Sequence, residues 1–220
     1  MIFKALYNVS VVTEPSGNAR KKEMYDMNAK KFLALAFAAT LVFGGSLHAQ
    51  TSTWAIDTAH SQSDFQIRHM GVSTVRGAIT GVKGTIVLDE KDITKSKVDA
   101  TLDASTINTG TDARDKHLKS PDFFDVAQFP TITFKSTSIA KSGDKLQLIG
   151  DLTLHGVTKS VTLDVDGPAP AQKGQGGKTI SGFSASGVLK RADFGIGTKF
   201  AATMLGDDVK FTIDLEIDKQ

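Results

Sequence analysis

Residues 210–218 read KFTIDLEID, and every second side chain in this stretch is apolar. The apolar members are Phe211, Ile213, Leu215 and Ile217, and each is flanked on both sides by Lys, Thr, Asp or Glu. Strict alternation of this kind is typical of a β-strand with one buried and one solvent-exposed face. Antiparallel sheets contain such strands, because one face of these sheets can remain in water. This segment therefore predicts an antiparallel β-protein.

The same two-residue period recurs along the chain. Residues 97–104 (KVDATLDA), 145–154 and 161–165 alternate in the same way. Weaker alternation marks five further candidates, at about 53–57, 62–69, 74–89, 131–140 and 180–189. Turn residues separate several of these stretches, as at Ser142-Gly143-Asp144 and His155-Gly156. The sequence predicts eight or nine strands in an all-β domain, and we expect the Pro/Gly/Lys-rich piece 167–178 to be a mobile loop within the sheet.

One stretch departs from the alternation, residues 111–130 (TDARDKHLKSPDFFDVAQFP). Thr111 is an N-cap residue type and precedes a short helical pattern. Ser120-Pro121 then resembles the N-cap and first position of a second helical turn, and Pro130 ends the stretch before the next strand. We therefore expect a short helical insertion in the sheet.

A single antiparallel domain of this length forms either a sandwich or a closed barrel. Small residues occupy several positions that should point inward, namely Ala100, Ala104, Gly150, Ala185 and Gly187. An eight-stranded barrel is just wide enough to be filled by side chains or to hold one small ligand. Small inward residues favour a barrel, and within it an interior that holds a ligand. The alternative is a packed interior filled by the large neighbours Phe65, Phe134, Phe183 and Phe211.

The N-terminal part of the chain has the composition of a secretory signal. Residues 27–49 combine two lysines, an apolar run at 32–43 and a small-residue end at Ala49. The apolar run is shorter than the roughly 20 residues that a membrane-spanning helix needs, although an uncleaved anchor is the alternative. We expect residues 1–49 to be a non-native upstream stretch plus this signal, and 50–220 to be one exported, periplasmic domain.

The composition excludes several classes of protein. The chain has 26 basic and 24 acidic residues, and removal of residues 1–49 takes away six basic and three acidic ones, which leaves a formal charge of −1. A nearly neutral domain of this kind is not expected to bind nucleic acid. The chain has no cysteine, so disulfides and cysteine-based metal sites are excluded.

The sequence contains no established catalytic motif. It lacks HExxH, GxSxG and GxGxxG, and its exported histidines are His60, His69, His117 and His155, without a metal-ligand spacing. His69 is in phase with apolar positions of the 62–69 strand, so we expect it to face inward. We predict no catalytic residue and no metal site.

Two arginines in irregular segments allow two interpretations. Arg114 and Arg191 each lie near aspartates, namely Asp112, Asp115 and Asp193. The first interpretation is a structural ion pair that joins the helix to the 190–197 loop. The second is a bidentate clamp for a phosphate or polar headgroup at the mouth of a cavity. Nearby phenylalanines form either a plug under the helix or one side of an apolar pocket: Phe123, Phe124, Phe129 and Phe134.

Four segments together resemble one known family. They are 53–71 (TWAIDTAHSQSDFQIRHMG), 114–136 (RDKHLKSPDFFDVAQFPTITFKS), 150–165 (GDLTLHGVTKSVTLDV) and 189–197 (LKRADFGIG). Their order and spacing are similar to those of the YceI family over about 54–217. The resemblance implies a periplasmic, lipocalin-like eight-stranded barrel around an elongated apolar cavity. Family members bind polyisoprenoids or similar long-chain amphiphiles, so the resemblance implies a lipid-binding protein and not an enzyme.

Candidate binding residues follow from the family motifs and from the alternation. The motifs imply cavity positions at Phe65, Ile67, His69, Phe123, Phe124, Ile132, Phe134 and Phe194, and rim or headgroup positions at Arg114, His117 and Arg191. The inward faces add Ala100, Leu102, Leu148, Leu152, Phe183, Ala185, Phe211 and Ile213. Two positions depart from the family pattern. Ser63 stands where the family often has an aliphatic residue, which would make one end of the cavity more polar, and Lys190 stands where it often has Asn.

These observations predict a carrier that sequesters a polyisoprenoid, quinone or fatty-acid-like lipid in the barrel, with no cofactor apart from that lipid. Two alternatives to the carrier remain. The second-ranked is a packed barrel that acts as a stress-related interaction module, and the third-ranked is an enzyme that acts on isoprenoid substrates. We expect a monomer or homodimer, transient contact with a membrane or membrane enzymes, and no nucleic-acid partner.

Overall fold

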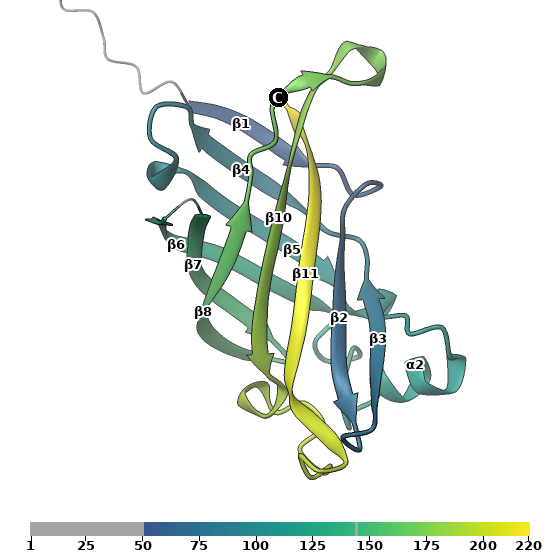
Figure 1. Cartoon of the computed structure of the whole chain (residues 1–220). Coiled ribbons are helices and arrows are strands. Elements are labelled where there is room, and N and C mark those ends of the chain that lie inside the picture. Colours follow the sequence, from purple (N-terminus) through teal and green to yellow (C-terminus); the bar gives the residue numbers. More distant parts are fainter. Residues whose placement is uncertain (1–50, 144) are drawn as a thin grey trace, which may run out of the picture. The chain divides into compact units, whose positions relative to one another are not determined.

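The computed structural model describes residues 51–143 and 145–220 (Figure 1). The predicted signal peptide at 27–49 and the upstream residues 1–26 lie outside the described residues. Within the described residues, no helix is both long enough and apolar enough to cross a membrane.

Eight antiparallel strands close into a barrel, as the alternation and the family motifs predicted (Figure 1). In spatial order around the ring they are β1 (Thr51–Ile56), β4 (Lys83–Asp89), β5 (Lys97–Asp103), β6 (Thr131–Ser142), β7 (Lys145–Leu154), β8 (Val157–Asp166), β10 (Thr179–Lys190) and β11 (Leu205–Lys219). The ring closes where residues 217–219 of β11 pair with residues 54–56 of β1. Closure removes the exposed edges that an open sheet of these strands would have.

A hairpin and a short strand extend this ring. β2 (Gln62–His69) and β3 (Ser73–Ile79) form the hairpin, which pairs with the free edge of β11 beyond its contact with β1. β9 (Gln172–Lys173) lies within the segment 167–178 and pairs with residues 179–180 at the start of β10. The segment, which was expected to be a mobile loop within the sheet, therefore contains a short strand of that sheet and the 3₁₀ turn that follows it.

The stretch 74–89 was predicted as one strand, and this prediction is wrong. The structure divides it into β3 and β4, which pair with different neighbours. Gly81 lies between them with φ = +73°, a left-handed conformation that glycine adopts without steric cost. The inward apolar positions change phase at this turn, from Val75 and Ile79 to Val82, Ile86 and Leu88, so the sequence did contain a sign of it.

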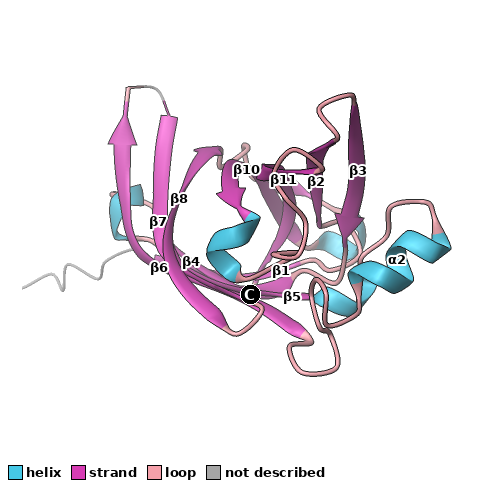
Figure 2. Cartoon of the chain, turned by 90° about the horizontal axis from the view of Figure 1, so that it is seen from below, coloured by secondary structure: helices cyan, strands magenta, loops and turns pink. Residues whose placement is uncertain are grey.

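The helical elements of residues 51–143 and 145–220 are short. They comprise α2 (Asp112–Leu118) and four 3₁₀ turns: η1 (Ile93–Lys95), η2 (Ala104–Thr106), η3 (Gln175–Gly177) and η4 (Arg191–Phe194). Thr111 is the N-cap of α2, as predicted, but its side chain makes no capping hydrogen bond. The expected second helical turn after Ser120 forms consecutive turns instead. Figure 2 shows α2 beside β3 at one side of the barrel.

The two ends of the barrel interior are filled differently. At the β1–β4 end, Trp54, Ile56, Ile86 and Ile217 are at most 6% exposed and belong to a packed hydrophobic core. Towards the opposite end the inward side chains surround a cavity. The barrel thus combines both arrangements that the sequence left open.

Glycines allow phenylalanine rings to lie against the inner surface of the barrel. Gly77 lies opposite Phe65 on β2, and Gly187 lies opposite Phe211 on β11. A Cβ atom at Gly77 would lie 2.6 Å from Phe65 Cζ, and one at Gly187 would lie 2.8 Å from Phe211 Cζ. The small inward residues therefore accommodate neighbouring rings as well as empty space.

Candidate functional site

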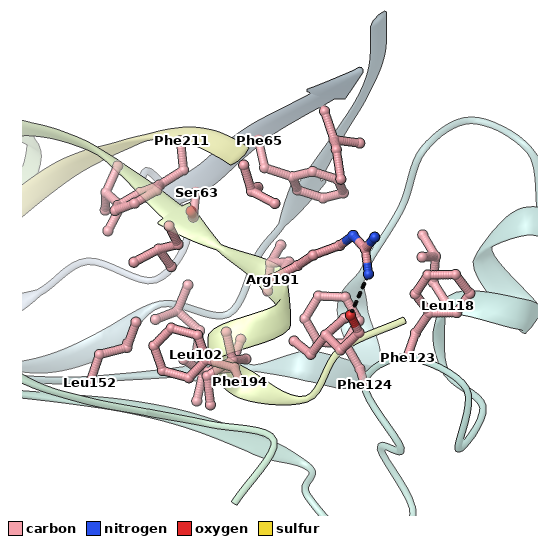
Figure 3. A pocket seen from close by; sticks show the side chains of 18 of the residues that line it. Ser63, Phe65, Leu102, Leu118, Phe123, Phe124, Leu152, Arg191, Phe194 and Phe211 are labelled. Carbon is pink, nitrogen blue, oxygen red and sulfur yellow. Dashed lines mark hydrogen bonds between the residues drawn. The ribbon is translucent and has the colours of Figure 1, made fainter. Parts of the chain in front are cut away.

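The hollow half of the barrel contains a cavity of about 440 Å³. Its sides are inward side chains of β2, β3, β5, β6, β7, β8, β10 and β11, together with residues of α2, of η4 and of the segments that follow α2 and η4 (Figure 3). Apolar side chains make up nearly all of this surface. Pockets of several hundred cubic ångströms with an apolar lining are typical small-molecule sites.

The structure places fifteen of the sixteen predicted cavity residues on the cavity surface. They are Phe65, Ile67, His69, Ala100, Leu102, Phe123, Phe124, Ile132, Phe134, Leu148, Leu152, Ala185, Phe194, Phe211 and Ile213. Phe183 is the exception. It lies half-buried against the packed core near Gly167 and does not line the cavity. Its phase along β10 is correct, but its position lies beyond the end of the cavity.

Several cavity residues were absent from the prediction. Some lie on strands and share the alternating phase of predicted neighbours, for example Val98, Leu163 and Leu215. The alternation could have identified these three. Phe200 and Met204 lie in the mouth loop, which we define as residues 195–204 between η4 and β11. This loop has no regular period, so no sequence pattern indicated them.

The cavity is blind at one end. Along β11 its surface includes residues up to Leu215 but not Ile217, and along β10 it includes Ala185 but not Phe183. On β2 the last lining residue in this direction is Ser63. The packed core lies beyond these positions, so a bound chain would end near Ser63 and Leu215.

The mouth is at the opposite end, where lining residues become exposed. His69 at the end of β2 is exposed, and the side chains of Met204 and His117 are about half exposed. Two segments meet here, because the Gly197 backbone N–H donates to the Asp122 carbonyl at 3.0 Å. The segment after α2 and the mouth loop therefore border the opening together.

Aromatic rings pack where these two segments meet. The rings of Phe123 and Phe200 are stacked, with centroids 5.3 Å apart and planes 16° apart. The His117 imidazole meets Phe123 edge-on at 5.0 Å. A ligand that passes between the segments would have to displace or slide along these rings.

A cluster of ionisable side chains, Asp122, His117 and Lys199, lies beside these aromatic rings. Asp122 pairs with His117 Nε2 through Oδ2 at 3.1 Å and with the Lys199 ammonium through Oδ1. Hydrogen bonds from Lys199 and, next, from His117 lower the pKa of Asp122 below its usual value. Sequence reasoning included His117 at the rim but missed Asp122 and Lys199, since 77 residues separate them in the chain.

Arg191 does not have either of the roles predicted for it. Its side chain is buried, 5% exposed, and its five N–H groups all donate to backbone carbonyls. Figure 3 draws one of these hydrogen bonds as a dashed line. The acceptors are Gly206 for Nε, Ile196 and Gly197 for Nη1, and Phe200 and Leu205 for Nη2, at 2.6–3.0 Å. Among the described residues it forms no ion pair, and no donor remains for a headgroup. Arg191 instead holds the mouth loop in place.

Arg114 also differs from the ion-pair interpretation. Its Nε donates to Thr109 Oγ1 at 2.7 Å, and its Nη2 donates to the Thr109 carbonyl and to Thr111 Oγ1. Thr109 in turn donates to the carboxylate of the buried Asp115. Among the described residues Nη1 makes no hydrogen bond. The predicted bridge to the 190–197 loop is therefore wrong, while Arg114 lines the cavity with one nitrogen available.

One cluster of potential cation ligands lies away from the cavity. Asp57, His60 and Glu216 bring their ligand atoms within 4.8 Å of one another at the β1–β2 corner. His60 Nδ1 lies 3.0 Å from Asp57 Oδ2 and 3.8 Å from Glu216 Oε1. The Asp57 hydrogen bond raises the pKa of His60, which is solvent-exposed. These contacts amount to a surface ion-pair group.

Comparison with known proteins agrees with this architecture. Residues 54–217 match the model of the YceI-like domain. The chain belongs to the YceI family. Protein YceI of Escherichia coli O6:H1 is 40% identical over 169 residues, which cover 77% of this chain and 88% of that protein.

Solved structures show the same fold. Burkholderia cenocepacia BcnA superimposes with a TM-score of 0.64 at 22% identity, covering 73% of this chain and 98% of BcnA. A polyisoprenoid binding domain from Saccharophagus degradans, implicated in plant cell wall breakdown, gives a TM-score of 0.55 at 14% identity and covers 76% of this chain and 98% of that domain. The same barrel fold thus recurs at low sequence identity.

The two departures from the YceI pattern have different positions. Lys190 pairs with Asp208 at 2.9 Å and does not line the cavity. Ser63 lies on the cavity surface near the blind end and is 9% exposed.

Proposed function

We propose that the protein binds a long-chain amphiphile, such as a polyisoprenoid, quinone or fatty-acid-like lipid, in the barrel cavity and carries it through an aqueous compartment. The observation that carries this proposal is a blind apolar cavity that opens at one end beside charged side chains. Membership of the YceI family supports it, as does the likeness to a domain described as polyisoprenoid-binding.

The proposed affinity comes from burial of hydrocarbon. Each CH₂ group removed from water contributes about 0.8 kcal/mol. Ten such groups would contribute about 8 kcal/mol before the cost of immobilising the chain, which is several kcal/mol. A cavity with few polar groups is suited to this kind of binding and not to catalysis, which needs positioned acids, bases or nucleophiles.

We further propose that the mouth contacts a membrane surface during loading and release. Met70 and Val72, in the turn between β2 and β3, are 57% and 84% exposed, and Met204 is 51% exposed. The Met70 N–H donates to the Met204 carbonyl at 2.8 Å, so these residues form one apolar tip. Met204 also lines the cavity, which makes the tip continuous with the apolar interior.

The proposed compartment is the periplasm, on the basis of the signal-like residues 27–49. Fractionation of cells that express the full chain tests this point. Release of the protein by osmotic shock, in a form shortened by about 49 residues, is the expected result. Retention of the full-length chain in the membrane fraction would support the uncleaved anchor.

Native mass spectrometry of protein purified from that fraction tests ligand binding. We expect a bound species that solvent extraction releases and that proves to be a polyprenyl or acyl compound. A protein without bound lipid that also fails to take up added isoprenoids would contradict the proposal. Such a protein would favour the interaction-module interpretation.

A further inference from the structure

The blind end of the cavity contains a polar side chain without a partner. Ser63 is 9% exposed, shares the inward phase of Phe65 and Ile67 on β2, and lines the cavity (Figure 3). Its hydroxyl makes no hydrogen bond to any described residue. The hydroxyl is open to the cavity, since every fully enclosed side-chain polar atom among the described residues has a hydrogen-bond partner. A ligand that covers this hydroxyl must supply a hydrogen-bond partner or leave it unpaired, which is unfavourable.

The surroundings of Ser63 are apolar. Its neighbours across the sheet are Ile79 on β3 and Ile213 on β11. The other polar side chains of the cavity surface are His69, Arg114, His117 and Arg191. His69, Arg114 and His117 lie on the elements that border the mouth. The N–H groups of Arg191 all donate to backbone carbonyls. Within the part of the chain that the structure describes, the blind end therefore offers one neutral hydrogen-bonding side chain and no charged one.

This arrangement restricts what can occupy the blind end. A hydrocarbon tail that reached it would cover the Ser63 hydroxyl without replacing its hydrogen bond to water. An anionic headgroup would lose its hydration there without meeting a cation. A neutral oxygen atom, in a hydroxyl or carbonyl group, both pairs with Ser63 and needs no charged partner.

We propose that Ser63 binds a neutral oxygen-bearing end of the ligand, which enters the barrel first and leaves the hydrocarbon chain extending towards the mouth. The inference rests on the proposed function and narrows its ligand class to long-chain alcohols, ketones, quinones and similar compounds. Amphiphiles whose polar end is a phosphate would bind less well in this orientation.

A pair of probes with equal heavy-atom counts tests the contact. Decan-1-ol and undecane are each titrated against a fluorescent dye, N-phenyl-1-naphthylamine, held in the full chain. The variants are Ser63→Ala and, as a control, Ser186→Ala, which removes an exposed serine of β10. The measured quantity is the ratio of the two dissociation constants, so a general loss of stability cancels.

We expect the wild-type protein and Ser186→Ala to prefer the alcohol by the same factor. In Ser63→Ala this preference should fall about three- to tenfold, the equivalent of one neutral hydrogen bond. Undecane should bind the variant at least as tightly as the wild type. An unchanged ratio in Ser63→Ala would overturn the inference while leaving the carrier function intact. Failure of both probes to displace the dye would instead contradict the proposed function itself.

The orientation has its own test. The chain has no cysteine, so Thr198→Cys in the exposed part of the mouth loop accepts a single nitroxide label. Decan-1-ol labelled with ¹³C at C1 or at C10 is then compared by NMR. We expect the label to broaden C10 more than C1. Stronger broadening of C1 would show that the hydroxyl faces the mouth and would overturn the inference.

Discussion

At the scale of single residues, Arg191 shows how chemistry depends on neighbours in space. Its position in the sequence, close to aspartates, suggested an ion pair or an anion clamp. In the structure five carbonyls converge on its guanidinium from residues 196–206. Arginine can satisfy them because its five donors lie in one planar fork. Lysine has the same charge but only three donors at one point.

Arg191→Lys should therefore destabilise the protein although the charge is retained. We expect the free energy of unfolding to fall by about 2–4 kcal/mol, because several buried carbonyls lose their donors. Urea denaturation followed by circular dichroism measures this change. The control is Arg76→Lys, an exposed arginine of β3, which should have little effect. Equal stability of both variants would show that the carbonyls find other donors.

At the scale of elements, the β1–β2 corner contains a pH-sensitive contact. The Asp57 carboxylate raises the pKa of His60 above its ordinary value of 6.5, and Glu216 adds to this effect. Because the folded-state pKa is raised, the stabilisation is complete below the unfolded pKa. It is lost as the pH rises through the higher folded pKa. His60 is exposed, so the contribution to stability is small.

The Asp57→Asn variant should remove most of this shift. A ¹H–¹⁵N NMR titration of the His60 ring should give a pKa above 6.5 in the wild type and one closer to 6.5 in the variant. If the variant leaves the His60 titration unchanged, Asp57 is not the cause of the shift.

The β2–β3 turn and the mouth loop together form the apolar tip. Replacement of both Met70 and Met204 by Gln should weaken binding to vesicles of phosphatidylethanolamine and phosphatidylglycerol. Burial of one methionine side chain contributes about 1.5 kcal/mol, so the loss should be at least tenfold. Cosedimentation with the vesicles measures it.

Val188→Gln is the matched control for the tip. Val188 is 56% exposed on β10 and lies outside the turn and the mouth loop. The control should bind vesicles as the wild type does. Equal binding by the double variant and the control would contradict the proposed membrane contact.

At the scale of the whole molecule, the barrel is packed at one end and hollow at the other, so its stability should depend on occupancy. A ligand present at 100 times its dissociation constant stabilises the folded state by about 2.7 kcal/mol. For a domain of this size that corresponds to a rise in Tm of roughly 5–10 °C. Calorimetry of delipidated protein with and without farnesol measures the shift.

The Ala185→Phe variant tests whether farnesol binds inside the cavity, since Ala185 is buried on the cavity surface near the blind end. A phenylalanine there should occupy part of the cavity and reduce the farnesol-dependent rise in Tm. A rise of the same size in the variant would place the farnesol site outside the cavity.

Much of this architecture follows from the sequence alone, because strand periodicity is a local property. Successive side chains of a strand point to opposite faces, so the inward residues of β5, β7 and β11 could be read directly from the alternation. The family motifs added the barrel and the cavity. Alternation could not reveal the end of the cavity before Phe183, since the pattern continues along β10 beyond it.

The sequence by itself thus determined the all-β class and the faces of the strands, since both depend on neighbours along the chain. Only the tertiary structure decided how deep the cavity is, where Ser63 lies in it and which partners Arg191 has. These properties depend on which strands close the ring and on how residues 196–206 fold back over η4. Contacts between residues distant in the chain leave no periodic trace, because they arise only when the barrel closes.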